Sequence, residues 1–290
     1  MTLFRDRLLF KAALAAMGLI VFGTWLGESV VQLISPWLPG LWFELLLSLV
    51  GLFLLLLWAW SLGTRLCSVQ TIRPLDAVEP RKVLILCCSP SRPKILNLLE
   101  NPRGDGGTKS MTVTLAPRGH SGTPVVLPLQ GRLDADIKDI ANLEKQDKQW
   151  NWEQLLRGLK PHLGIVERIY LIGSMGDDGS YQELEQIRSL LALYVAEGLP
   201  IELMPETDFD EPMAVFRSIE KAVGLARRVG CSQSDIVIDV TGGQKVVSIA
   251  GAMATLHCPK IIFQYVDTKG DKQVRGFNVT AASHESLSAS

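Results

Sequence analysis

The stretch Ile236–Lys245 reads IVIDVTGGQK, an apolar strand that runs into a glycine pair, a lysine and a helix-forming segment. Paired glycines let backbone N–H groups approach an anion without interference from Cβ atoms, and the N-terminus of the following helix favours negative charge. The pattern therefore predicts a strand-turn-helix unit that binds phosphate. It also fits a turn whose glycines serve only tight packing, with Asp239 at the strand end as a cap of the turn.

Further apolar runs without polar alternation accompany this unit, as expected for strands that helices cover on both faces. Ser180 with Glu183 predicts a capping box for one intervening helix. Asp210 and Pro212 predict the start of another helix, which Gly230 ends. The alternation predicts an α/β fold with a Rossmann-like, mostly parallel sheet over residues 82–280. The predicted strands are Val83–Cys88, Arg168–Gly173, Ile201–Met204, Asp235–Val240 and Lys260–Val266.

The segment between the first two predicted strands departs from this alternation. Residues 101–110 are rich in glycine, and Met111–Leu115 and Val125–Leu129 have the composition of two short strands. Residues 134–160 then show a weakly amphipathic helical pattern that includes Trp150 and Trp152. We expect a loop, an inserted β-hairpin and a helical segment.

Ligands of open parallel sheets bind beyond the carboxyl ends of the strands, so the residues that follow each strand are candidate site residues. Three such loops carry hydroxyls, glycines and cations, which together predict a polyphosphate-like cradle. The fingerprints GxxxxGK[ST] and GxGxxG do not occur at these turns, which argues against phosphate-loop ATPase chemistry and a dinucleotide cofactor. The candidates are Ser89, Pro90, Ser91 and Arg92; Gly173, Ser174 and Met175; and Thr241, Gly242, Gly243, Gln244 and Lys245.

The first 64 residues are far more apolar than the rest of the chain. Residues 12–34 and 41–63 are two runs of about the 20 residues needed to cross a bilayer. Lys and Arg flank the pair on both sides and are absent from the connecting loop, which places both termini in the cytoplasm. We expect a transmembrane helical hairpin over residues 1–64, a linker over 65–81 and a disordered tail over 281–290. A signal peptide is the alternative for the first run, but its apolar core usually has about 7 to 15 residues.

Two carboxylates fall in the outer portions of the apolar runs. Intramembrane carboxylates usually face a bundle interior or water, so Glu28 and Glu44 are candidate pore-lining residues. Alternatively, each lies close enough to the end of its run to reach the headgroups. Glu44 would then lie in the first turn of its helix, where the helix dipole stabilises a negative charge.

The composition of the 290-residue chain narrows its partners. The formal net charge is -1, and no dense basic run indicates a long nucleic acid as partner. The five cysteines form no CxxC pair, as is typical of a reducing compartment. Neither the cysteines nor the four histidines have zinc-ligand spacing, so we expect no metal site and no cofactor.

The Ser-Pro loop at Ser89, together with Asp239–Lys245 opening an Ala- and Gly-rich helix, resembles the CARF domain, the CRISPR-associated Rossmann fold, over residues 81–280. The resemblance implies that Thr241–Lys245 contacts the phosphates and riboses of a cyclic oligoadenylate, with Ser89, Ser91 and Arg92 as the opposing wall. It also implies a homodimer that shares one ring, and cyclic tetra-adenylate is favoured over hexa-adenylate. A symmetric cyclic anion suits a two-fold interface built from identical loops. Gln244 stands where many members of the family carry threonine or serine.

The resemblance and the apolar runs together predict a membrane effector of type III CRISPR antiviral defence. Its sensor would lie in the cytoplasm, its hairpins in a prokaryotic inner membrane, and ligand binding would rearrange the hairpins, as a higher homo-oligomer, to form or gate a pore. Two alternatives stay open. A membrane-tethered ring nuclease would hold a ribose 2′-hydroxyl in line with its phosphate, although no acid/base pair with indicative spacing supports an enzyme. A membrane-anchored recruiter would dock another effector.

Overall fold

The computed structural model describes residues 25, 49–58, 69–75, 77–101, 109–117, 123–144, 150–243, 245–267 and 272–282. The chain divides into two compact units, Met1–Val69 with Ala281–Ser290, and Gln70–Thr280. Most of the two predicted spans, Glu28, Glu44, Gln244 and nearly all of the predicted tail lie outside the described residues. Among the described residues, no helix is long and apolar enough to span a bilayer.

The described part of the second apolar run, residues 49–58, is helical. Its large apolar side chains are exposed, by 41% at Trp58 to 62% at Phe53. Apolar surface gathered in this way usually contacts lipid or another protein. The exposed side chains are Leu49, Val50, Phe53, Leu54, Leu56, Leu57 and Trp58.

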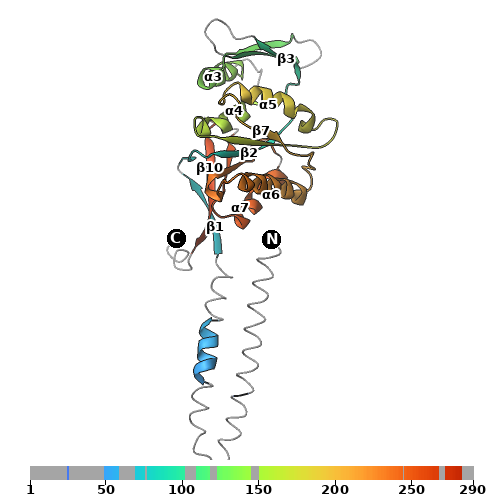
Figure 1. Cartoon of the computed structure of the whole chain (residues 1–290). Coiled ribbons are helices and arrows are strands. Elements are labelled where there is room, and N and C mark those ends of the chain that lie inside the picture. Colours follow the sequence, from blue (N-terminus) through green and yellow to red (C-terminus); the bar gives the residue numbers. More distant parts are fainter. Residues whose placement is uncertain are drawn as a thin grey trace, which may run out of the picture. The chain divides into compact units, whose positions relative to one another are not determined.

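The larger unit is built on a seven-stranded sheet with the order β1-β10-β9-β8-β2-β6-β7 (Figure 1). The five strands from β9 to β7 are parallel, and β10 pairs antiparallel with β9. The chain moves from β2 through β6 to β7, and then returns to β8 on the other side of β2. This is the order of doubly wound, Rossmann-like sheets, and it places the topological switch point between β2 and β8. The strands are β1 (Val69–Leu75), β2 (Val83–Cys88), β6 (Arg168–Gly173), β7 (Ile201–Leu203), β8 (Ile236–Asp239), β9 (Ile262–Val266) and β10 (Val274–Ala282).

Helices cover both faces of this sheet, α4 and α5 on one face and α6 and α7 on the other (Figure 1). Alternate side chains of β2 enter the two cores, so β2 is buried along its whole length. This burial confirms the prediction from apolar runs without polar alternation. The helices are α3 (Leu133–Glu144), α4 (Glu153–Leu159), α5 (Leu184–Ala192), α6 (Pro212–Arg228) and α7 (Lys245–His257), with short 3-10 segments η1 (Lys160–His162), η2 (Ser180–Glu183) and η3 (Gln233–Asp235).

A separate three-stranded antiparallel sheet is inserted after β2 and is followed by α3. It consists of β3 (Ile95–Asn101), β4 (Ser110–Leu115) and β5 (Val125–Leu129). The predicted hairpin is β4 with β5. The prediction omitted β3, which pairs with β4.

Two other predictions differ from the structure. Val69–Leu75, which we expected within the linker, forms β1 beside β10. Ser180 and Glu183 make no capping box, because Gly179 precedes η2 and makes no side-chain cap. The Ser180 hydroxyl donates instead to the carbonyl oxygen of Cys88 at 2.7 Å, and the Glu183 carboxylate accepts the Ser91 N–H at 2.6 Å. Both side chains therefore support the loop after β2.

Candidate functional site

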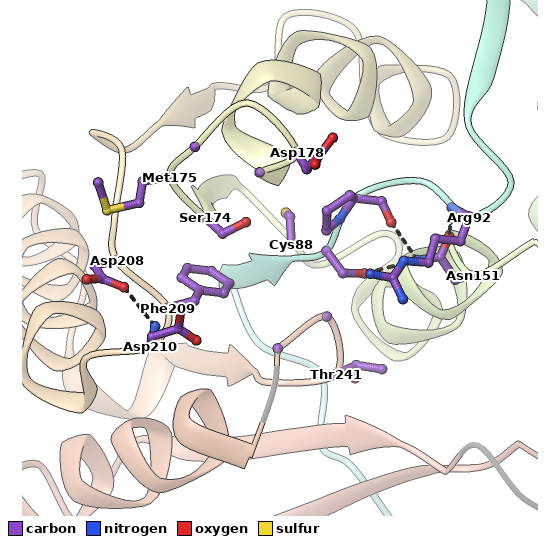
Figure 2. Close-up of a pocket in the computed structure, with 16 residues that line it drawn as sticks. Cys88, Arg92, Asn151, Ser174, Met175, Asp178, Asp208, Phe209, Asp210 and Thr241 are labelled. Carbon is purple, nitrogen blue, oxygen red and sulfur yellow. Dashed lines mark hydrogen bonds between the residues drawn. The ribbon is translucent and has the colours of Figure 1, made fainter.

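A cavity of about 620 Å³ lies beyond the carboxyl ends of the parallel strands (Figure 2). The loops after β2, β6, β7 and β8 form its walls, as the switch point predicts. Its volume is within the range of about 300–1,000 Å³ that is usual for small-ligand sites. The lining residues are Cys88, Ser89, Pro90, Arg92, Asn151, Ser174, Met175, Gly176, Asp178, Gly179, Asp208, Phe209, Asp210, Thr241, Gly242 and Gly243.

The cavity brings together most of the residues predicted from the sequence. The structure places these at its wall: Ser89, Pro90, Arg92, Ser174, Met175, Thr241, Gly242 and Gly243. They come from three separate loops, so the rule that ligands lie beyond the strand ends identified residues that are far apart in the chain.

The turn after β8 is held in place by buried side chains and by close packing. Asp239 caps the turn, because its Oδ1 accepts the Thr241 N–H at 2.8 Å. A Cβ atom at Gly242 would lie 2.2 Å from the carbonyl oxygen of Cys87, and one at Gly243 would lie 2.2 Å from Val247. Packing against β2 and α7 therefore requires both glycines. This packing alone accounts for the glycine pair, so the pair is not by itself evidence of a ligand.

A chain of buried polar groups extends from this turn toward the opposite end of β2. The Gln264 amide donates to Asp239 Oδ2 at 2.8 Å and its oxygen lies 2.9 Å from His162 Nε2. His162 Nδ1 accepts the Arg81 N–H at 3.0 Å. Burial lowers the pKa of His162 and raises the pKa of Asp239. The position of the turn is thus coupled to the start of β2 by an unbroken chain of hydrogen bonds.

The loop after β2 is held by the tripeptide Trp150-Asn151-Trp152. The Asn151 amide donates to the Ser89 hydroxyl at 3.1 Å and accepts the Arg92 N–H at 2.7 Å. The indole N–H of Trp152 donates to the Ser89 carbonyl oxygen at 3.0 Å. These bonds fix the backbone of the loop and leave the Arg92 guanidinium directed toward the cavity (Figure 2).

Three predicted site residues that the structure describes do not line the cavity. Ser91 is buried, and its hydroxyl donates to Pro93 and accepts from the Trp150 indole. Gly173 is buried against Tyr181. Lys245 is the exposed first residue of α7 and is not among the lining residues. Gln244 lies outside the described residues.

The loop after β6 is braced by a pair of hydroxyls. Ser174 N–H donates to the Ser180 hydroxyl at 2.8 Å, and the two hydroxyls lie 3.1 Å apart. Ser180 in turn contacts Cys88 at the end of β2. The loops after β2 and β6 are therefore linked directly behind the cavity wall.

The sequence reasoning missed Asn151, Asp178, Asp208, Phe209 and Asp210. Asp208–Asp210 follows the predicted strand at residue 201, so the same strand-end rule identifies it. Asp210 was assigned as a helix cap, but Glu211 occupies that position and the Asp210 N–H donates to Asp208 Oδ1 at 2.8 Å. Asn151 lies between α3 and α4, and no strand end in the sequence indicates it.

The cavity has walls of different chemical character. Figure 2 shows Arg92 with Asn151 on one side, and Met175, Asp208 and Phe209 on the other. Arg92 favours an anionic group, whereas carboxylates accept hydrogen bonds from hydroxyl and amino groups. The cavity therefore suits a ligand with an anionic part, several hydrogen-bond donors and a flat apolar part. Among the residues that the structure describes, no group of three or more His, Cys, Asp or Glu is placed to hold a metal ion.

Comparison with known proteins gives one partial similarity. A protein of Aquifex aeolicus (strain VF5), described as uncharacterized, is 29% identical to this chain over 138 residues. The matched segment covers 47% of this chain and 44% of the Aquifex protein, so it spans less than half of that relative's length. No protein-family model and no solved structure matches the chain.

Proposed function

We propose that this protein is a cyclic oligoadenylate sensor of the CARF type that acts at a prokaryotic inner membrane in type III CRISPR defence. The observation that carries the proposal is the cavity at the switch point of the sheet, where the Ser89–Arg92 loop and the Thr241–Gly243 turn share one hollow. These are the two segments on which the resemblance to CARF domains rests. Their convergence supports a common ligand.

The chemistry of the walls supports a nucleotide as this ligand. Phosphate fits the wall of the cavity that Arg92 forms. The turn Thr241–Gly243, which also lines the cavity, leads into the N-terminus of α7, and a helix N-terminus favours negative charge. Asp208 and Asp210 on another wall offer acceptors for ribose hydroxyls and for the adenine amino group. Met175 and Phe209 offer an apolar surface for the base. One cavity in each protomer of a two-fold dimer would share a symmetric ring.

The N-terminal unit supports the membrane part of the proposal. The apolar runs at residues 12–34 and 41–63 have spanning length, and the described helix at residues 49–58 exposes its large apolar side chains. Ligand binding to the cytoplasmic dimer rearranges these hairpins, which assemble and perturb the bilayer. Glu28 and Glu44 are the pore-lining residues of this proposal.

Calorimetry of the purified full chain with cyclic tetra-adenylate and cyclic hexa-adenylate tests ligand binding. We expect Arg92→Gln to weaken binding by about one to two decades, because a hydrogen bond to a charged group contributes about 1.5 to 3 kcal/mol. Arg188→Gln is the matched control, since Arg188 lies exposed on α5, pairs with Glu185 and does not line the cavity. It should bind like the wild type.

Two results would count against the proposal in different ways. If the folded wild-type chain binds neither ring, the sensor function is wrong. If Arg92→Gln binds as tightly as the wild type, Arg92 does not hold the phosphate and the assignment of the site fails.

Slow cleavage of the ring is the second candidate function. The carboxylates of Asp178, Asp208 and Asp210 line the cavity, and a positioned carboxylate can accept the proton of an attacking ribose 2′-hydroxyl. Incubation of the full chain with labelled ring for several hours tests this activity. The absence of any linear product excludes it.

A further inference from the structure

Helix α4 is in contact with two walls of the cavity at once. The tripeptide Trp150-Asn151-Trp152, directly before the helix, holds the Ser89–Arg92 loop by hydrogen bonds. Near the other end of the helix, the carbonyl oxygen of Gly158 accepts the Gln264 amide at 2.8 Å. The same amide donates to Asp239, which caps the turn after β8. One short helix therefore joins the loop after β2 to the turn after β8.

Close packing ties the movement of α4 to that of this turn. A Cβ atom at Gly158 would lie 2.3 Å from Asp239 Oδ2, so the backbone of the helix lies directly against that carboxylate. Leu155, Leu156 and Leu159 of α4 are buried in the core on the same side of the sheet. Because such cores are close-packed, a helix within them shifts as a unit and carries its neighbours with it. A shift of α4 would displace both walls.

A buried ion cluster holds the first residue of α4. Glu153 Oε1 accepts Arg157 Nε at 2.8 Å, one turn along the helix, and Glu153 Oε2 accepts Lys272 Nζ at 2.9 Å. The side chains of Glu153 and Lys272 are only 2% and 12% exposed. Exposed ion pairs contribute little to stability, whereas removing one partner of a buried pair is costly. Loss of the Lys272 charge should therefore release the start of α4.

The two ends of α4 are both held by one β-hairpin. Gln264, which binds Gly158, belongs to β9, and Lys272, which binds Glu153, lies in the connection between β9 and β10. Neither Glu153 nor Lys272 is among the residues that line the cavity. They can act on the site only through α4, so they are candidates for positioning residues.

We infer that α4 couples the loop after β2 to the turn after β8, and that the ion pair between Glu153 and Lys272 sets the position of both. Breaking the ion pair loosens the two walls together. Coupling between two sites is reciprocal, so a ligand that holds both walls also stabilises the ion pair. Occupancy of the cavity is thereby transmitted to the connection between β9 and β10.

Hydrogen exchange of Lys272→Met in the full chain tests the inference without any ligand. Methionine keeps an unbranched apolar side chain and removes the charge. Exchange should accelerate about tenfold at the amides of Arg92 and Thr241, which report on the loop after β2 and the turn after β8. The Ser174 amide, which the Ser180 hydroxyl holds in the loop after β6, should exchange as in the wild type.

Two further variants are matched controls for Lys272→Met. Lys272→Arg keeps a cation beside Glu153, so both amides should exchange more slowly than in Lys272→Met. Arg275→Met removes the cation of a different ion pair of the same hairpin, formed with Asp267, and should leave both amides unchanged. Acceleration at only one of the two amides overturns the inference. Equal acceleration at Ser174 indicates general loss of stability and overturns it as well.

Calorimetry with cyclic tetra-adenylate extends the test to binding, and this arm rests on the proposed function. Lys272→Met should bind the ring about tenfold more weakly than the wild type, and Arg275→Met should bind it equally well. Unchanged affinity of Lys272→Met would overturn transmission between the cavity and the ion pair. If the wild type binds no ring, the proposed function fails, while the exchange rates still decide whether α4 couples the two walls.

Discussion

His162 is held in its neutral form by the backbone around it. The Arg81 N–H occupies Nδ1, so the ring proton is on Nε2, where it meets the Gln264 oxygen. Protonation would place a second N–H against that of Arg81 and a charge in a buried site. Burial accordingly lowers the pKa of His162 from its ordinary value of 6.5, and the positive charge of Arg81 acts in the same direction.

Stability should therefore depend on pH through His162. Below pH 6.5 the unfolded chain binds a proton that the folded chain excludes, so stability is retained above pH 6.5 and lost as the pH falls toward the folded pKa. The loss is at most about 1.4 kcal/mol per pH unit for one proton. We expect the Tm of the wild type to fall between pH 7.5 and 5.5, and the Tm of His162→Gln to fall less.

The comparison with His162→Gln separates His162 from other titrating groups. Asp239 belongs to the same chain of hydrogen bonds, and its raised pKa has the opposite effect, since the folded chain gains the proton more readily as the pH falls. Both proteins retain Asp239, so only the difference between their slopes reports on His162. Parallel curves of Tm against pH would contradict the assignment.

Among the elements, the turn between β8 and α7 depends closely on its two glycines. Its two glycines allow the turn to approach β2 and α7, and Gly251 of α7 lies where a Cβ atom would be 2.5 Å from Val240. The small residues of α7 thus bring the helix close to its own strand. The wall of the cavity is fixed by this packing.

Replacement of Gly242 should destabilise the fold. In Gly242→Ala the new Cβ would lie 2.2 Å from the Cys87 oxygen and 2.8 Å from the Ser89 nitrogen, both backbone atoms that side-chain rotation cannot move away. We expect a loss of about 1 to 3 kcal/mol, as for other overpacked sites. Gly224→Ala in α6 is the control, because its new Cβ would meet no atom within 4 Å beyond its chain neighbours and the backbone of its own helix. That change should raise stability by up to about 1 kcal/mol.

The melting temperatures of the two alanine variants measure these effects. A lower Tm for Gly242→Ala and an equal or higher Tm for Gly224→Ala are expected. If Gly242→Ala melts like the wild type, the turn can retreat from β2 and the packing requirement is wrong.

The connection between α3 and α4 shapes the site through Asn151. In Asn151→Ala the Arg92 N–H loses its acceptor, while the Ser91 N–H keeps its bond to Glu183. Hydrogen exchange should therefore accelerate at the Arg92 amide far more than at the Ser91 amide. Asn97→Ala on the exposed side of β3 serves as the control and should change neither amide. Equal acceleration at both amides would indicate general loosening of the loop.

The central strands were predictable because their signal is local. The predicted bounds of β2 and β6 agree residue for residue with the structure. Each strand is a largely apolar run flanked by polar residues, and these mark where the strand begins and ends. β3 is an edge strand and β10 lies next to the edge strand β1. Both mix polar and apolar residues, so their sequences carry no continuous apolar run that marks a strand.

The same distinction applies to the site. Strand-end loops such as Thr241–Gly243 follow from topology, which the alternation of strands and helices predicts. Asn151 reaches the site only because α4 and the tripeptide before it pack against the loop after β2. Tertiary contacts of this kind leave no periodic pattern in the sequence.

At the scale of the whole molecule, the proposed effector joins a nucleotide site to an apolar N-terminal unit. The chain of hydrogen bonds from Asp239 ends at Arg81, just before β2. Residues 64–80 connect Arg81 to the second apolar run in the sequence. Movement of the turn on ligand binding would reach Arg81 through bonds that are already formed. We therefore expect sensor and membrane segment to respond together.

Ion flux through liposomes that contain the full chain tests this coupling. Cyclic tetra-adenylate should release a trapped ion or dye, and cyclic hexa-adenylate should release less, as the resemblance to CARF domains implies. Arg92→Gln should require about tenfold or more ligand for the same flux, since it weakens binding without altering the membrane segment. Glu28→Gln and Glu44→Gln should change ion selectivity and leave ligand affinity intact, because both residues lie outside the sensor. Inserted protein that binds the ring without any flux would rule out the pore and favour recruitment of another effector.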